Sequence, residues 1–146
     1  MSTTKSLYHI VINTKGRLMT IPEEHKRQLY AYIYGIIKNR GCSLVRMNGI
    51  PNHIHMLIDL SAKVSLSEFM RELKRSSSLW AKSHRELFPI FMGWGREYYA
   101  FSCGIDQKEN IVEYIKNQET HHHVIGFDDE MRDMAKANEC DYYVYD

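Results

Sequence analysis

The chain has 146 residues, of which 44% are hydrophobic and 25% are charged. This length supports one domain with a single core and is too short for two full-sized domains. No apolar run approaches the ~20 residues of a membrane span, and the N-terminal residues lack the apolar core of a signal peptide. Three widely spaced cysteines, Cys42, Cys103 and Cys140, favour reduced thiols over a disulfide framework or a zinc ribbon. We therefore expect one cytoplasmic, non-membrane domain over residues 1–146.

The formal net charge is only +1, but the charges are unevenly distributed. Residues 126–146 carry seven acidic and two basic side chains, which leaves a net charge of +6 on residues 1–125. A moderately basic body suits a protein that binds a polyanion, although an ordinary solvated surface gives the same balance. The acidic C-terminal extension is a poor contact for a polyanion. We expect it to cover a dimer surface or to gate a neighbouring helix.

Local patterns predict four strands and three main helices. Apolar and β-branched runs typical of strands occupy residues 7–13, 42–47, 53–60 and 94–103. Capping boxes, in which Ser, Thr or Asp precedes Glu by three positions, begin at Thr20, Ser65 and Asp106. The helices that follow them extend to about Asn39, Leu87 and His121. A further short helix is expected in the acidic extension.

The order of the elements, strand–helix–strand–strand–helix–strand, matches the ferredoxin-like split βαβ arrangement. The predicted fold class is α/β, with an antiparallel sheet, helices on one face and a helix toward the C-terminus that carries Tyr114. The open face of such a sheet must be covered by a partner subunit, a nucleic acid or the additional helix.

Residues 51–58 (PNHIHMLI) contain the strongest group of candidate metal ligands. His53 and His55 are two positions apart on a predicted strand, so both imidazoles project from one face and can reach one metal ion. Two unrelated histidines on a half-exposed strand would have the same spacing. The pair alone therefore leaves both interpretations open.

A second group lies on the predicted helix that ends near His121. Tyr114 and Gln118 are four positions apart, so they share one face of this helix, and His121 continues it. A tyrosine at the edge of the core and a solvated glutamine are the ordinary alternatives. The three consecutive histidines at residues 121–123 are interpreted as surface residues or an adventitious metal site.

Together these residues can form a site that cleaves phosphodiesters. A divalent cation bound by His53, His55 and the Gln118 carbonyl oxygen would polarise a phosphate and stabilise its developing charge. Tyr114 would attack phosphorus and form a 5′-phosphotyrosine, which conserves the bond energy for rejoining. Imidazole and amide-oxygen ligands suit Mg²⁺ or Mn²⁺, and the imidazoles alone would also admit Zn²⁺.

The sequence resembles the single-tyrosine HUH transposases of bacterial insertion sequences, where HUH means His-hydrophobic-His, and their REP-associated relatives. The matching segments, in the same order, are residues 8–11, 14–17, 51–55 and 114–118 followed by histidines. The resemblance implies the ferredoxin-like fold, Mg²⁺ or Mn²⁺, Tyr114 as nucleophile, and His53, His55 and Gln118 as metal ligands. It also implies single-stranded DNA hairpins as substrates and an obligate homodimer, in which the tyrosine helix of one chain serves the histidines of the other.

Basic side chains gather on the predicted helix of residues 66–87 and just after the first strand. Those expected to neutralise DNA phosphates are Lys15, Arg17, Arg71, Lys74, Arg75 and Lys82. An exposed helix face with interspersed acidic residues is the plainer interpretation.

Three other functions stay open at this point. They are a non-catalytic nucleic-acid-binding protein of ferredoxin-like fold, a domesticated endonuclease acting on genomic REP hairpins, and a metal-dependent hydrolase without covalent catalysis. Gln118 argues against the last, because an amide is a poor general base.

Overall fold

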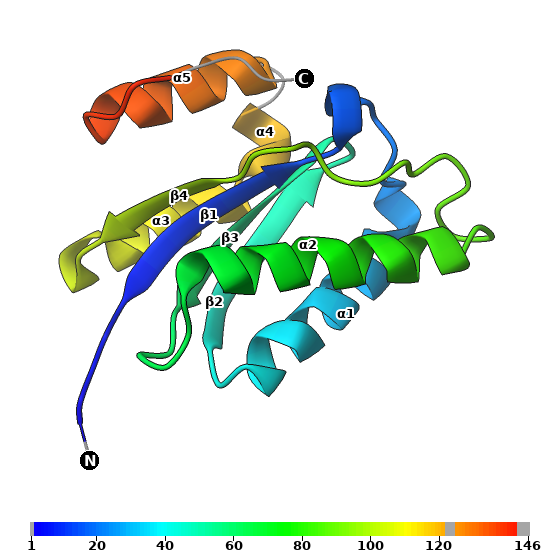
Figure 1. Ribbon diagram of the computed structural model, residues 1–146. Helices are drawn as coiled ribbons and strands as arrows, with labels where there is room; N and C mark the ends of the chain where they lie inside the picture. Colours follow the sequence, from blue (N-terminus) through cyan, green and yellow to red (C-terminus); the bar gives the residue numbers. More distant parts are fainter. Residues whose placement is uncertain (1, 122–124, 143–146) are drawn as a thin grey trace.

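One four-stranded antiparallel sheet organises the chain in a computed structural model, which describes residues 2–121 and 125–142. Strands lie side by side in the order β2-β3-β1-β4 (Figure 1). Their bounds are β1 Leu7–Asn13, β2 Ser43–Ile50, β3 His53–Asp59 and β4 Tyr99–Cys103. The α-helices are α1 Lys26–Asn39, α2 Leu66–Ser83, α3 Lys108–Lys116, α4 Gln118–His121 and α5 Phe127–Ala137. The element order and the antiparallel pairing confirm the expected ferredoxin-like arrangement.

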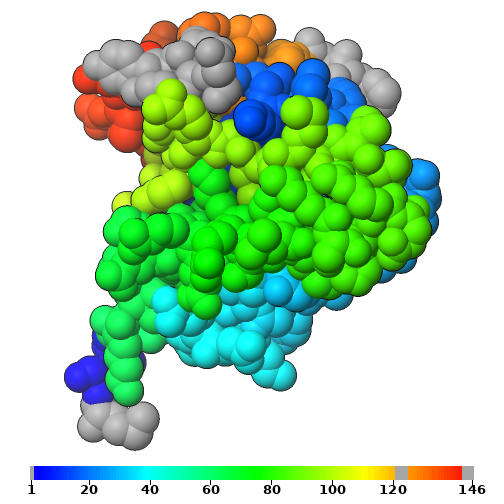
Figure 2. Space-filling view, turned by 45° about the vertical axis from the view of Figure 1, so that its right-hand side comes forward, coloured from blue at the N-terminus to red at the C-terminus, as the bar shows by residue number. Residues whose placement is uncertain are grey.

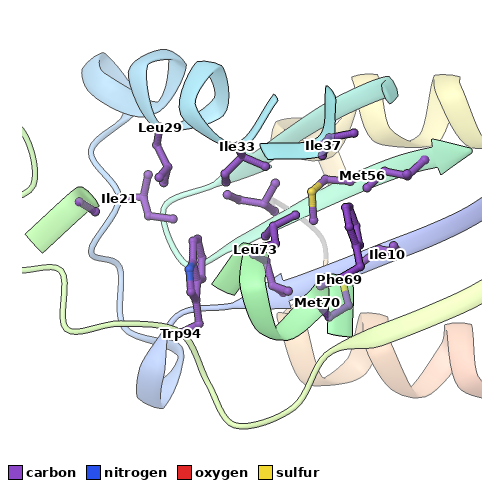
Figure 3. Close-up of a cluster of buried hydrophobic side chains, with 14 of the residues drawn as sticks. Ile10, Ile21, Leu29, Ile33, Ile37, Met56, Phe69, Met70, Leu73 and Trp94 are labelled. Carbon is purple, nitrogen blue, oxygen red and sulfur yellow. The ribbon is translucent and has the colours of Figure 1, made fainter. Parts of the chain in front are cut away.

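The main core lies between the sheet and the pair α1 and α2. Alternation along β1 and β3 directs Ile10 and Met56 to this face, where α1 and α2 pack their apolar sides against them (Figure 3). The helix residues in this cluster include Leu29, Ile33 and Ile37 of α1 and Phe69, Met70 and Leu73 of α2. This layer anchors the two central strands, so side chains on their opposite face have defined positions.

Helices α3 and α5 cover the opposite face of the sheet (Figure 1). Ile115 of α3 packs against Leu57 of β3, and Met131 of α5 packs in a cluster with Val11 of β1. The sequence left a partner subunit, a nucleic acid or an additional helix as possible covers for this face. Within this chain, an additional helix covers it. Helix α5, which belongs to the acidic extension, supplies part of this cover.

The fourth strand is shorter than predicted. Trp94 makes only an isolated bridge with Thr14, and regular pairing with β1 begins at Tyr99. Between them, the carbonyl oxygens of Arg96 and Glu97 accept hydrogen bonds from Lys74 Nζ of α2 at 3.1 and 3.3 Å. The backbone thus bonds to a helix side chain where the aromatic pattern predicted a sheet ladder.

Helix ends also differ from the predictions. Ser65 caps α2 as expected, since its hydroxyl accepts the Glu68 N–H, but α2 ends at Ser83 rather than near residue 87. Thr20 caps no helix, because the 3₁₀ turn Glu23–His25 precedes α1 and follows Pro22. The third predicted capping box does not form at Asp106, which lies inside the 3₁₀ turn Ile105–Gln107. The side chain of Gln107, rather than that of Glu109, accepts a hydrogen bond there, from the Gly104 N–H.

The predicted helix to His121 is interrupted at Asn117, where α3 ends and α4 begins one residue later. Among the described residues, no helix is both long enough and apolar enough to cross a lipid bilayer.

Candidate active site

Strand β3 places both histidines of the His-x-His sequence on the face covered by α3 and α5. His53 lies opposite Asn13 of β1, and His55 lies opposite Val11. Both imidazoles are 0% exposed, whereas the half-exposed strand considered from the sequence would leave them in water. Their shared orientation follows from the two-residue period of a strand, as predicted.

Each imidazole has a polar neighbour at Nδ1. His53 Nδ1 lies 2.7 Å from Asn52 Oδ1, and His55 Nδ1 lies 2.8 Å from His9 Nε2. Burial, followed by the nearby His55, lowers the pKa of His9 to about 3, so His9 is neutral at pH 7. A neutral His9 can accept the His55 Nδ1–H. Sequence reasoning did not identify His9 as a site residue.

The break between α3 and α4 turns Gln118 into the site. Asn48 of β2 donates through Nδ2 to the carbonyl oxygens of Ile115 and Lys116 at the end of α3, and to Glu119 of α4. These bonds cap carbonyls that a helix end leaves unsatisfied. Gln118 is fully buried, with Oε1 3.1 Å from His53 Nε2.

Tyr114 lies beside the same imidazoles of its own chain. Its ring meets those of His9 and His55 edge to face, with centroids 5.9 and 5.6 Å apart. Its hydroxyl donates a hydrogen bond to Glu130 Oε2. Burial, and then this bond to a carboxylate, raise the pKa of the Tyr114 hydroxyl above its ordinary value. The side chain of His121, which was expected to continue this face, lies outside the described part of the structure. Residues 122–124 also lie outside it.

Glu130 of α5 is the residue on which the site converges, and sequence reasoning missed it. Its carboxylate lies 3.2 Å from His53 Nε2 and 3.2 Å from His55 Nε2, and it accepts a bond from Gln118 Nε2 at 2.9 Å. A signal was present, because Glu130 interrupts the apolar spacing of Phe127 and Met131 on the buried side of an amphipathic helix.

The donors at this point suit a divalent cation. Ligand atoms of His53, His55 and Glu130 lie within 4.8 Å of one another, and all three residues are buried. Imidazole nitrogens combined with carboxylate and amide oxygens are ligands for Mn²⁺ and related ions. The residues present therefore fit the metal that the resemblance implies.

A groove of about 780 Å³ runs between α2 and the segment that leads to β4. These two segments lie next to each other on the face shown in Figure 2. Five of the six predicted DNA-binding residues line this groove, namely Lys15, Arg71, Lys74, Arg75 and Lys82. Arg17 is directed elsewhere, since its Nε forms a 2.7 Å ion pair with Asp128 of α5.

The profile of the family described as "Transposase IS200 like" matches residues 2–118 of this chain, from before β1 to Gln118. The chain belongs to the IS200-like transposase family. The matched region includes His53, His55, Tyr114 and Gln118, whereas α5 and Glu130 lie beyond it.

Two curated relatives support the assignment of this transposase to the IS200-like family. It is 29% identical over 121 residues to the transposases for insertion sequence element IS200 of Salmonella typhimurium and Salmonella typhi, covering 76% of this chain and 75% of each relative.

Two solved structures share the fold. A Deinococcus radiodurans R1 protein assigned as a transposase has a TM-score of 0.63 and 24% identity, over 80% of this chain and 93% of its own. A REP-associated tyrosine transposase bound to a REP hairpin has a TM-score of 0.65 and 15% identity, over 86% and 76%.

Proposed function

We propose that this IS200-like transposase cuts and rejoins single-stranded DNA at hairpin-flanked ends through a 5′-phosphotyrosine intermediate. Tyr114 is the proposed nucleophile, and His53, His55 and Gln118 are proposed to bind Mg²⁺ or Mn²⁺. The observation that carries the proposal is the convergence of the Tyr114 hydroxyl and both imidazoles on one buried carboxylate. Family membership supports DNA transposition as the process.

The proposed reaction exchanges one phosphodiester for another. The Tyr114 oxygen loses its proton and attacks phosphorus, the bond from phosphorus to the 3′-oxygen breaks, and the released 3′-oxygen takes up a proton. When bound, the divalent ion supplies Lewis-acid stabilisation of the phosphate charge. Burial, and then the hydrogen bond to Glu130, raise the pKa of Tyr114, so withdrawal of the carboxylate or approach of positive charge would favour loss of the hydroxyl proton.

The substrate needs a route to this site. His53 and His55 are fully buried beneath α5, so a scissile phosphate reaches them only after α5 moves. The basic groove is the proposed binding surface for the DNA hairpin, with Lys15, Arg71, Lys74, Arg75 and Lys82 neutralising phosphates. Arg17 is proposed to join them when α5 moves, because its present partner is Asp128 of that helix.

We also propose a homodimer with composite sites. Strands β2 and β4 are the outer strands of the sheet, and such edges are natural seams between subunits. Within one chain Tyr114 already reaches the histidines, so exchange between chains requires the tyrosine helix to leave this position. Light scattering on the purified protein is expected to give twice the mass of one chain, and a monomer mass would contradict the dimer.

The experiment that tests the function uses labelled single-stranded hairpin DNA with Mn²⁺. Wild-type protein is expected to form a DNA adduct that survives denaturation. Tyr114→Phe is expected to bind the hairpin but form no adduct, because it lacks the attacking oxygen. Tyr142→Phe is the matched control and should form the adduct normally. Adduct formation by Tyr114→Phe would disprove the nucleophile assignment, and hairpin binding without any wild-type adduct would favour a non-catalytic protein.

A further inference from the structure

Helix α5 brings a buried carboxylate to the two histidines from outside the region that the family profile matches. Glu130 is 1% exposed and lies between Phe127 and Met131 on the side of α5 that packs against the sheet. Burying a carboxylate is costly unless positive charge and hydrogen bonds compensate it. A divalent cation held beside this carboxylate would supply such positive charge.

The donor atoms lie close enough together to bind one ion. Glu130 Oε1 lies 3.2 Å from His53 Nε2, and Glu130 Oε2 lies 3.2 Å from His55 Nε2. Groups bound to one cation at about 2.1 Å lie about 3.0–3.5 Å apart in octahedral or tetrahedral geometry. Both carboxylate oxygens are thus within the range that a shared divalent cation requires.

The outer partners orient the imidazoles for this role. Asn52 Oδ1 lies 2.7 Å from His53 Nδ1 and can accept its proton, so that Nε2, 3.2 Å from Glu130 Oε1, can serve as the metal-binding atom. His9 Nε2 lies 2.8 Å from His55 Nδ1 and can orient that imidazole in the same way. Hydrogen bonds from the second ring nitrogen are the usual means by which proteins orient metal-binding histidines.

We propose that Glu130 is a third protein ligand of the divalent cation in the DNA-free transposase, together with His53 and His55. Gln118 then also positions this carboxylate, since its Nε2 donates to Glu130 Oε2 at 2.9 Å. This inference rests on the proposed metal-dependent function and adds a ligand from α5, which the resemblance did not supply. A DNA phosphate is also an anionic oxygen ligand and would compete with Glu130 for the ion.

The test measures Mn²⁺ binding to the full chain without DNA, by following free Mn²⁺ with electron paramagnetic resonance. Glu130→Gln keeps the size of the side chain but removes its charge, and we expect it to weaken Mn²⁺ binding by about tenfold or more. Asp133→Asn removes one exposed charge from the same helix and is expected to leave the affinity unchanged. His55→Ala is expected to abolish binding.

The outcomes separate this inference from the proposed function. If Glu130→Gln binds Mn²⁺ as tightly as the wild type, or more tightly, the ligand role of Glu130 is overturned. The His55→Ala variant tests the histidine site independently of this result. Absence of wild-type Mn²⁺ binding would overturn the inference, and the adduct assay would then judge the transposase chemistry separately.

A second measurement on the wild type guards against misfolding of the variant. Addition of Mg²⁺ is expected to shift the side-chain carboxyl ¹³C resonance of Glu130 while leaving that of Asp133 unchanged. An unshifted Glu130 resonance at saturating Mg²⁺ would likewise overturn the proposal.

Discussion

Gly49 lies opposite Ile54 in the β2–β3 ladder, next to the strand position that carries His53. A Cβ at Gly49 would lie 2.1 Å from the His53 carbonyl oxygen and 2.9 Å from the Ile54 Cα. Because these are backbone atoms, they cannot rotate away. Gly49→Ala is therefore expected to destabilise the protein by about 1–3 kcal/mol, the range typical of overpacking, as measured by urea unfolding.

The matched control for this change is Gly35→Ala in the interior of α1. A Cβ there meets nothing within 4 Å, and alanine favours a helix over glycine by about 0.5–1 kcal/mol. The two substitutions are thus expected to have opposite signs. Equal destabilisation by both would show that the close approach at Gly49 has no special effect.

At the scale of elements, Asn48 connects β2 to the helix that carries Tyr114. Asn48→Ala removes its bonds to the last carbonyls of α3 and to Glu119 of α4. We expect a loss of about 1–2 kcal/mol in unfolding free energy, because helix-end carbonyls lose a partner. Hydrogen–deuterium exchange over residues 108–121 should become faster.

Asn110→Ala provides the comparison, since this exposed asparagine belongs to the same helix. It should leave exchange in residues 108–121 nearly unchanged. Similar exchange in both variants would mean that Asn48 does not hold the tyrosine helix against β2.

At the scale of the whole molecule, basic and acidic surfaces are separated. Helix α2 lines the basic groove, and α5 carries Asp128 and Asp129 in its first turn. The double substitution Arg71→Ala with Arg75→Ala is expected to weaken hairpin binding. Each lost phosphate contact should reduce the slope of log affinity against log salt by about 0.7–0.9, measurable by fluorescence anisotropy. Arg132→Ala on α5 should leave the slope unchanged, and an unaltered slope in the double variant would exclude the groove as the hairpin surface.

Across these scales, local patterns predicted the elements best where a single periodicity dominates. Residues 7–13 became β1 with the predicted bounds, and His53 began β3 as expected, because β-branched and apolar side chains fit a central strand that is covered on both faces. The patterns were less reliable at helix ends and in β4. There, tertiary contacts such as Lys74 with the Arg96 carbonyl compete with the local preference.

The amino-acid sequence by itself determined the fold class, the family, and the placement of His53 and His55 on one face of a strand, because strand geometry makes this a local property. Only the tertiary structure decided that His9 meets His55 across 46 positions, and that Gln118 meets His53 across 65. It also decided that Glu130 completes the group. That contact depends on how α5 packs across the sheet, and the residues of α5 encode a buried side without specifying what lies opposite it.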